Sequence, residues 1–220
     1  MEVVFIKVIL NYLEYILLSI NAILYTYSYL KKAKNKAIKY FAIYLILIFC
    51  VLLGSQLIID IQREFNFTEN NLYLSHFYFI FQFIFLSLFY SQLFTKKQIK
   101  CQKITTGLVF FILTIQYALN PSLFEKFNLL EIFITSFPLV IYSIFHLYNS
   151  LSKAGKFMYI NAGVLIYLAT STLIFILGDY LINVDREITA DVWFLNRVFY
   201  VGYLVLILIE WKKSLLKTKD

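Results

Sequence analysis

The stretch Asn11 to Leu30, NYLEYILLSINAILYTYSYL, recurs as NLLEIFITSFPLVIYSIFHL from Asn128 to Leu147, at a constant offset of 117 residues. Identical residues occupy matching positions without a gap, among them Asn11/Asn128, Glu14/Glu131, Ser19/Ser136 and Tyr25/Tyr142. Self-similarity at a fixed offset is typical of an internal duplication. The alternative is chance agreement between two membrane helices of the same composition. We interpret the stretch as the first helix of a repeated unit.

The composition indicates a membrane protein. Of the 220 residues, 61% are hydrophobic and only 15% are charged, which leaves too little polar surface for a soluble domain of this size. Mean hydropathy is +0.75. Apolar runs of about 20 residues are long enough to cross the hydrocarbon layer as helices. We therefore expect an integral membrane protein with several spans and no separate soluble domain.

Short polar segments divide the chain into seven apolar runs. Backbone inside a bilayer must satisfy its own hydrogen bonds, and these runs are too long and too continuously apolar for the strands of a membrane barrel. The sequence therefore predicts an all-α bundle of seven transmembrane helices. The predicted spans are about 5–30, 39–61, 72–94, 104–120, 128–149, 157–181 and 192–211.

The basic residues predict the orientation of the bundle. Fifteen of the 20 lie in four alternate segments, at 31–39, 95–103, 149–156 and 212–220. Lys and Arg are retained on the cytoplasmic side of membranes, so we expect the N-terminus outside and the C-terminus inside. The net charge of +7 is concentrated where anionic lipid headgroups lie, and it requires no nucleic-acid partner. Together with a composition rich in Lys, Asn and Phe, this orientation suggests the cytoplasmic (inner) membrane of a bacterium.

The repeat and the orientation together predict the domain organisation. A unit of three helices crosses the membrane an odd number of times, so a second unit in the same orientation needs one additional helix before it. The fourth and shortest run supplies this helix. We divide the chain into a first three-helix repeat at 1–103, a linker helix with its outer loop at 104–127, and a second repeat with a basic tail at 128–220.

This arrangement of three, one and three helices with parallel repeats resembles the SWEET and PQ-loop transporters, whose two units face each other across a substrate path. The resemblance implies a transporter-like bundle with a ligand site between the units. It is one of architecture, because the Pro-Gln motif is absent and only Pro138 lies at a matching helix position. No functional residue is carried over from it.

Polar side chains form one stripe on the first helix and one on the fifth. The stripes are Asn11, Glu14, Asn21, Tyr25 and Ser28, and Asn128, Glu131, Thr135, Pro138 and Tyr142. Helical spacing places each set on one face, which should face the bundle interior because polar groups facing lipid are costly. The predicted ligand-binding residues are Glu14, Asn21, Tyr25, Gln56, Asp60, His76, Glu131, Tyr142, Asn196, Arg197 and Tyr200. Alternatively, these groups only hold helices together, at about 0.6 kcal/mol per contact.

The charged residues at membrane depth predict two pairs. Leu74-Ser75-His76 in the third run corresponds approximately to Leu195-Asn196-Arg197 in the seventh, so each unit has one carboxylate and one cationic or titratable partner. We predict that Glu14 pairs with Arg197 and stays ionised, because arginine does not deprotonate. We predict that Glu131 lies near His76 and forms a site whose protonation changes near neutral pH.

Three functions remain open at this point. The first is a transporter or channel for a small polar or ionic ligand. The second is a ligand-sensing, regulatory or accessory membrane subunit, for example of a bacterial defence or signalling system, with a cytoplasmic protein partner at the lysine-rich loops. The third is an intramembrane hydrolase, which would require His76 to meet a carboxylate. No catalytic residue set, metal site or cofactor is indicated, and Cys50 and Cys101 lie at different depths and suggest no disulfide.

Overall fold

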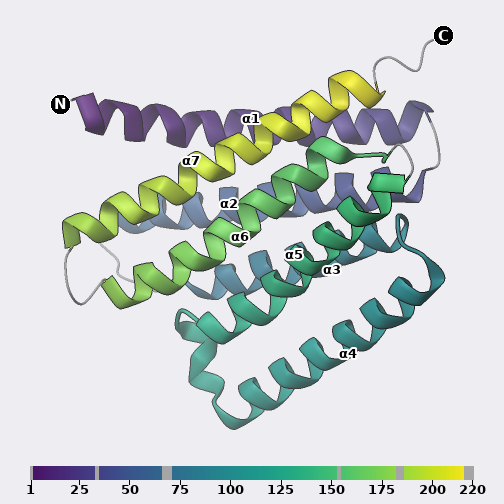
Figure 1. Cartoon of the computed structure of the whole chain (residues 1–220). Helices are drawn as coiled ribbons and strands as arrows, with labels where there is room; N and C mark the ends of the chain where they lie inside the picture. Colours follow the sequence, from purple (N-terminus) through teal and green to yellow (C-terminus); the bar gives the residue numbers. More distant parts are fainter. Residues whose placement is uncertain (1, 33–34, 66–70, 153–154, 182–185, 216–220) are drawn as a thin grey trace.

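The computed structural model describes residues 2–32, 35–65, 71–152, 155–181 and 186–215, and in these ranges the chain is helical apart from short connections (Figure 1). The elements are α1 (Glu2–Lys32), α2 (Lys36–Phe65), α3 (Tyr73–Ser91), α4 (Lys96–Leu119), a short 3-10 turn η1 (Pro121–Glu125), α5 (Leu129–Ser152), α6 (Met158–Leu181), α7 (Arg186–Glu210) and a final π-helical turn η2 (Trp211–Leu215). The predicted all-α class is confirmed.

Seven of these helices are long and apolar enough to span a membrane. Their candidate spans run from 19 to 30 residues, close to the roughly 20 helical residues that cross the hydrocarbon layer. Many large apolar side chains remain exposed on the bundle surface, as expected where lipid is the solvent. The chain is a multi-pass membrane protein.

Six helices form a closed ring in which each packs against the next, in the order α1, α2, α3, α5, α6, α7 and back to α1. Helix α4 lies outside this six-helix ring. It touches α3, α5 and η1, and it runs along one side of the bundle in Figure 1. Two groups of three consecutive helices, α1 to α3 and α5 to α7, therefore face each other around a common centre.

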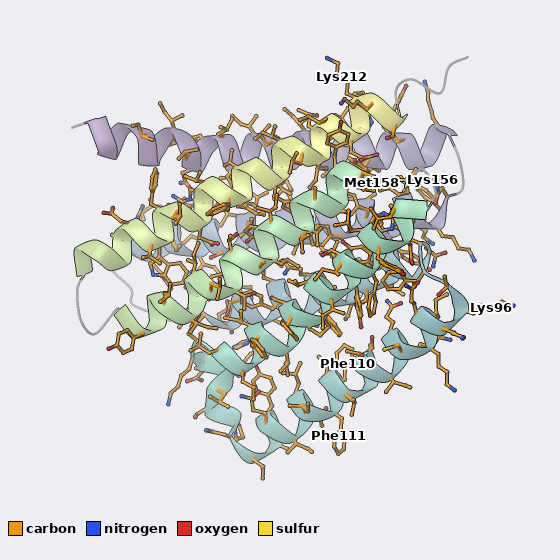
Figure 2. The ribbon with its side chains drawn as sticks, viewed as in Figure 1. Lys96, Phe110, Phe111, Lys156, Met158 and Lys212 are labelled. Carbon is orange, nitrogen blue, oxygen red and sulfur yellow. The ribbon has the colours of Figure 1, made fainter. Side chains whose placement is uncertain are left out.

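One end of the bundle is basic. Lys96 at the start of α4, Lys156 before α6 and Lys212 after α7 are distributed along the same end of the bundle, on the right in Figure 2. We call this the basic end, and the other the opposite end. The predicted basic segments also include 33–34, 153–154 and 216–220, which lie outside the described residues.

The half of the ring near the basic end is densely packed. Phe41, Leu45 and Phe89 are completely buried there, and the rings of Phe41 and Phe89 lie 5.3 Å apart. Hydrogen bonds between helices add to this packing: Tyr90 donates its hydroxyl to Asn161 Oδ1 at 2.9 Å, and the Asn161 amide donates to the backbone oxygen of Ser143 at 3.1 Å. Helices α3, α5 and α6 are thereby joined by side chains as well as by apolar contacts.

Two predicted boundaries are wrong. Helix α4 begins at Lys96 rather than near 104, because Thr95 and Gln98 form a reciprocal capping box that starts the helix inside the lysine-rich segment. Helix α7 begins at Arg186 rather than near 192. Hydropathy detects the apolar part of a membrane helix, whereas its hydrogen-bonded backbone continues into the polar interface.

Candidate functional site: a cavity within the six-helix ring

A cavity of about 330 Å³ lies in the half of the ring away from the basic end. Its wall comes from α1, α2, α3, α6 and α7, together with residues just before α3 and α5. The lining residues are Glu14, Val51, Leu52, Ser55, Asn71, Leu72, Leu74, Ser75, Tyr78, Phe79, Phe127, Tyr167, Phe175, Trp193, Asn196, Arg197 and Tyr200. Both groups of three helices therefore contribute to one cavity.

An ion pair lies in the wall of the cavity. Arg197 Nε on α7 is 3.2 Å from Glu14 Oε2 on α1, which confirms the predicted pairing of these two residues. The Glu14 side chain is only 13% exposed, whereas that of Arg197 is 39% exposed. The guanidinium of Arg197 also carries two terminal nitrogens, which can donate hydrogen bonds to a bound molecule.

Aromatic rings form most of the remaining wall. Tyr78 and Tyr167 share a hydrogen bond between their hydroxyls at 3.2 Å, and the ring of Tyr167 stacks on that of Tyr203 with centroids 5.4 Å apart. Gly163 permits this stack, because a Cβ atom there would lie 2.7 Å from the Tyr203 ring. Towards the opposite end, the ring of Phe175 packs edge-on against Phe127 and at a tilt against Trp193. The cavity is thus mainly apolar, with its charges on one side.

Two polar atoms in the lining residues lack a hydrogen-bond partner among the described residues. They are the hydroxyl of Tyr200, a residue that is only 5% exposed, and Oδ1 of Asn196. Buried polar groups are normally paired, so an unpaired group in a native structure often marks a place where water, an ion or a ligand completes the bonding. Both residues lie on α7 within one turn of Arg197.

The second predicted pair, His76 and Glu131, is also present but lies at a different place. Nδ1 of His76 on α3 contacts Oε2 of Glu131 on α5, and both side chains are almost completely buried. Tyr117 on α4 donates its hydroxyl to the same carboxylate oxygen at 2.6 Å and lies 2.9 Å from His76 Nδ1. Asn128 donates to the Tyr117 hydroxyl at 3.2 Å. We call these four residues the His76 network.

The second ring nitrogen of His76 also has a polar partner, because Nε2 lies 3.0 Å from the backbone oxygen of Phe124. Both nitrogens of this imidazole are therefore in hydrogen-bonding contact with other residues of the chain.

The His76 network attaches α4 to the ring. The ring of His76 is stacked on Phe124 of η1 at 5.1 Å, and Gln116 of α4 donates to Asn128 Oδ1 at 3.0 Å. The contact of a histidine with a carboxylate meets the condition set above for an intramembrane hydrolase. However, neither the cavity within the ring nor a second cavity, which lies between α3 and α4, is lined by His76 or Glu131. This enclosure of the pair favours a structural role.

The remaining predicted residues lie outside the cavity lining. Asn21 donates to the backbone oxygen of Leu204 at 2.9 Å and Tyr25 to that of Ile207 at 3.0 Å, so both join α1 to α7 in the packed half of the ring. Gln56 donates to Asp60 at 3.0 Å, and Asp60 lies 3.8 Å from Arg63 on the exterior of α2. Tyr142 is buried against Tyr90 and Phe94 near the basic end. Both polar stripes are buried in the interior, as predicted, from Asn21 onward in α1 and along the whole set in α5.

Several lining residues were not predicted. Ser55 and Asn71, whose side chains are joined by a 3.2 Å hydrogen bond, line the cavity in place of the predicted Gln56. Helix α2 is apolar on every side, so its sequence contains no periodicity that would indicate which face lies inward. Tyr78 and Trp193 were also missed, because aromatic residues are abundant throughout the chain.

The described residues contain no group of three or more His, Cys, Asp or Glu side chains that could hold a metal ion. Comparison with protein-family models found no match, and comparisons with curated proteins and with solved structures found none either.

Proposed function

We propose that this protein binds a small polar or ionic organic molecule in the cavity within the six-helix ring and carries it across the membrane. The observation that supports this most strongly is the Glu14–Arg197 pair in the cavity wall. Charged side chains at membrane depth are costly and are usually associated with a ligand or ion path. A cavity of about 330 Å³ is at the small end of the range for ligand sites.

The chemistry of the wall suggests the class of ligand. Arg197 presents guanidinium donors that suit a carboxylate or another anionic group, while Glu14 balances its charge and can accept from an amine. Tyr78, Tyr167 and Phe175 offer aromatic faces to an apolar portion of the same molecule. We therefore propose a compact anion or zwitterion with an apolar body as the ligand.

The two groups of three helices suggest how the ligand would move. We propose that these two groups correspond to the two repeats and that the protein lies in the inner membrane of a bacterium. The opposite end of the bundle would face outside, and the ligand would enter the cavity from that end. Buried polar side chains continue from the cavity towards the basic end, including Tyr203 and Tyr44, whose hydroxyls lie 3.4 Å apart, and then Asn21 and Tyr25. Separation of the two groups near the basic end would expose this line of polar groups as an exit.

Ligand sensing is the second candidate, and the packing of the ring near the basic end favours it. A receptor needs access to its cavity from one side only, and Phe41, Leu45 and Phe89 close the ring on the other side. In that case a partner protein at the lysine-rich segments would detect ligand binding. The two functions share the same cavity and differ in whether the basic end opens.

A thermal-shift screen tests the binding site and finds its ligand class at the same time. Purified protein in detergent is heated with a panel of amino acids, carboxylic acids, nucleosides and sugars, and we expect members of the first two classes to raise the melting temperature. Arg197→Gln and Glu14→Gln should abolish the shift. Arg63→Gln and Asp60→Asn are matched controls, because this exposed pair lies on the exterior of α2 and should leave the shift intact.

Transport and sensing are separated by a second measurement. Protein reconstituted in liposomes is given the radiolabelled compound that produced the largest melting shift. Accumulation that Arg197→Gln removes and Arg63→Gln retains supports transport. Binding with no accumulation would contradict transport and support the sensor.

A further inference from the structure

A second cavity, of about 570 Å³, lies between α4 and the six-helix ring. It is lined by Ile84, Ser87, Leu88 and Ser91 of α3, by Gln92 directly after α3, and by Ile99, Gln102, Lys103, Thr106 and Phe110 of α4. We call it the α3–α4 groove. We propose that it is a specific site for one anionic phospholipid, whose headgroup is held at the basic end.

The groove exists because α4 is attached to the ring at its two ends. Near the opposite end, the His76 network and Gln116 hold it. Near the basic end, the side-chain amides of Gln98 and Asn149 exchange hydrogen bonds of 3.1 and 2.9 Å, and Gln102 donates to the backbone oxygen of Ser87. Between these attachments the contacts of α4 with the ring are apolar. Val109 and Leu113 are buried there, and the aromatic ring of Phe110 lies 6.2 Å from that of Phe83.

The groove is polar near the basic end and apolar deeper in the bundle, which is the order of headgroup and acyl chain in a phospholipid. Gln92, Ser91 and Lys103 lie near the basic end, whereas Ile84 and Phe110 lie deeper in the bundle. Figure 2 shows Phe110 directed from α4 towards the bundle, while its neighbour Phe111 points away. From Gln92 to Ile84 the groove extends about 12 Å at 1.5 Å per helical residue. That length fits within one leaflet, which is about half of the ~30 Å hydrocarbon layer.

The charge of the site indicates an anionic headgroup. Lys96, Lys100 and Lys103 follow one another at spacings of four and three residues, so they share one face of the first turns of α4, beside the groove. All three are exposed. The N-terminus of a helix also carries a partial positive charge that favours anions. A phosphatidylglycerol headgroup would be attracted both by the three lysines and by the N-terminus of α4, while an acyl chain of the same lipid occupies the groove.

Native mass spectrometry of the purified full chain tests this proposal, with dioleoyl phosphatidylglycerol and dioleoyl phosphatidylcholine as probes. We expect one phosphatidylglycerol to bind at least tenfold more tightly than phosphatidylcholine. Replacing Lys96, Lys100 and Lys103 together by Gln should remove that preference. The matched control replaces three other lysines of the basic end, Lys36, Lys156 and Lys212, by Gln and should retain it.

A second variant tests the acyl-chain part of the site. Thr106→Phe fills the groove and should reduce binding of both lipids at least tenfold, and Ser91→Phe provides an independent variant if the first does not fold. Equal binding of the two lipids to the wild type would overturn the proposal, as would equal effects of the two triple-lysine variants. A dimer that Thr106→Phe dissociates would assign the groove to a second copy of the chain and would also overturn it.

Discussion

Removal of one hydroxyl from the His76 network should loosen the attachment of α4. Tyr117→Phe keeps the ring, which packs edge-on against His76 and Phe124 at 5.7 and 6.3 Å, and deletes only the oxygen. That oxygen makes three polar contacts, to Glu131 at 2.6 Å, His76 at 2.9 Å and Asn128 at 3.2 Å. At about 0.6 kcal/mol each for hydrogen bonds inside membrane proteins, the expected destabilisation is roughly 2 kcal/mol.

Unfolding of the purified protein by increasing mole fractions of dodecyl sulfate in mixed micelles would measure this loss. The control is Tyr148→Phe, which removes a hydroxyl from a side chain that is 72% exposed on α5 and should leave stability unchanged. Mild proteolysis provides a second measurement, because a loosened α4 should be cleaved faster in Tyr117→Phe. If Tyr117→Phe and Tyr148→Phe unfold alike, the His76 network does not hold α4 and the explanation of the α3–α4 groove fails with it.

Two further predictions concern packing and orientation. Gly163→Ala should lower the free energy of unfolding by about 1–3 kcal/mol in the same dodecyl sulfate titration, because the new methyl group meets the buried ring of Tyr203. Gly54→Ala is the control and should leave the free energy of unfolding unchanged, because nothing lies within 4 Å of the added methyl group. In a background without native cysteines, Asn71→Cys should react with an impermeant thiol reagent added outside intact cells and Asn35→Cys should not; the reverse pattern would contradict the proposed orientation.

The two charged pairs were predictable from the sequence because membrane interiors contain few charges, and each has few partners of opposite sign at its depth. Glu14 and Arg197 on α1 and α7, and His76 and Glu131 on α3 and α5, contact each other as predicted. What the sequence did not indicate is that the pairs serve different sites. One lies in a cavity wall, and the other is enclosed beneath α4.

The repeated stretch shows why the sites differ. Asn128 precedes α5 and its Oδ1 accepts from the backbone N–H of Glu131 at 3.2 Å, as an N-cap residue does. The matching Asn11 lies within α1, which begins nine residues earlier at Glu2. Matching positions of the repeated stretch therefore lie at the start of α5 but inside α1. The reason is that Pro121 and η1 interrupt the chain before α5, whereas apolar residues extend α1 towards the N-terminus. Local identity did not reveal this difference in context.

The affinity of the cavity for a ligand tests the central claim most directly. The compound with the largest melting shift is titrated against wild type, Ser55→Phe and Leu57→Phe by isothermal titration calorimetry. Ser55 lines the cavity, so the added ring should occupy part of its volume and weaken binding at least tenfold. Leu57 is 59% exposed on another face of α2, and the same ring there should change affinity less than twofold. Equal affinity of Ser55→Phe and Leu57→Phe would contradict the assignment of the cavity as the binding site.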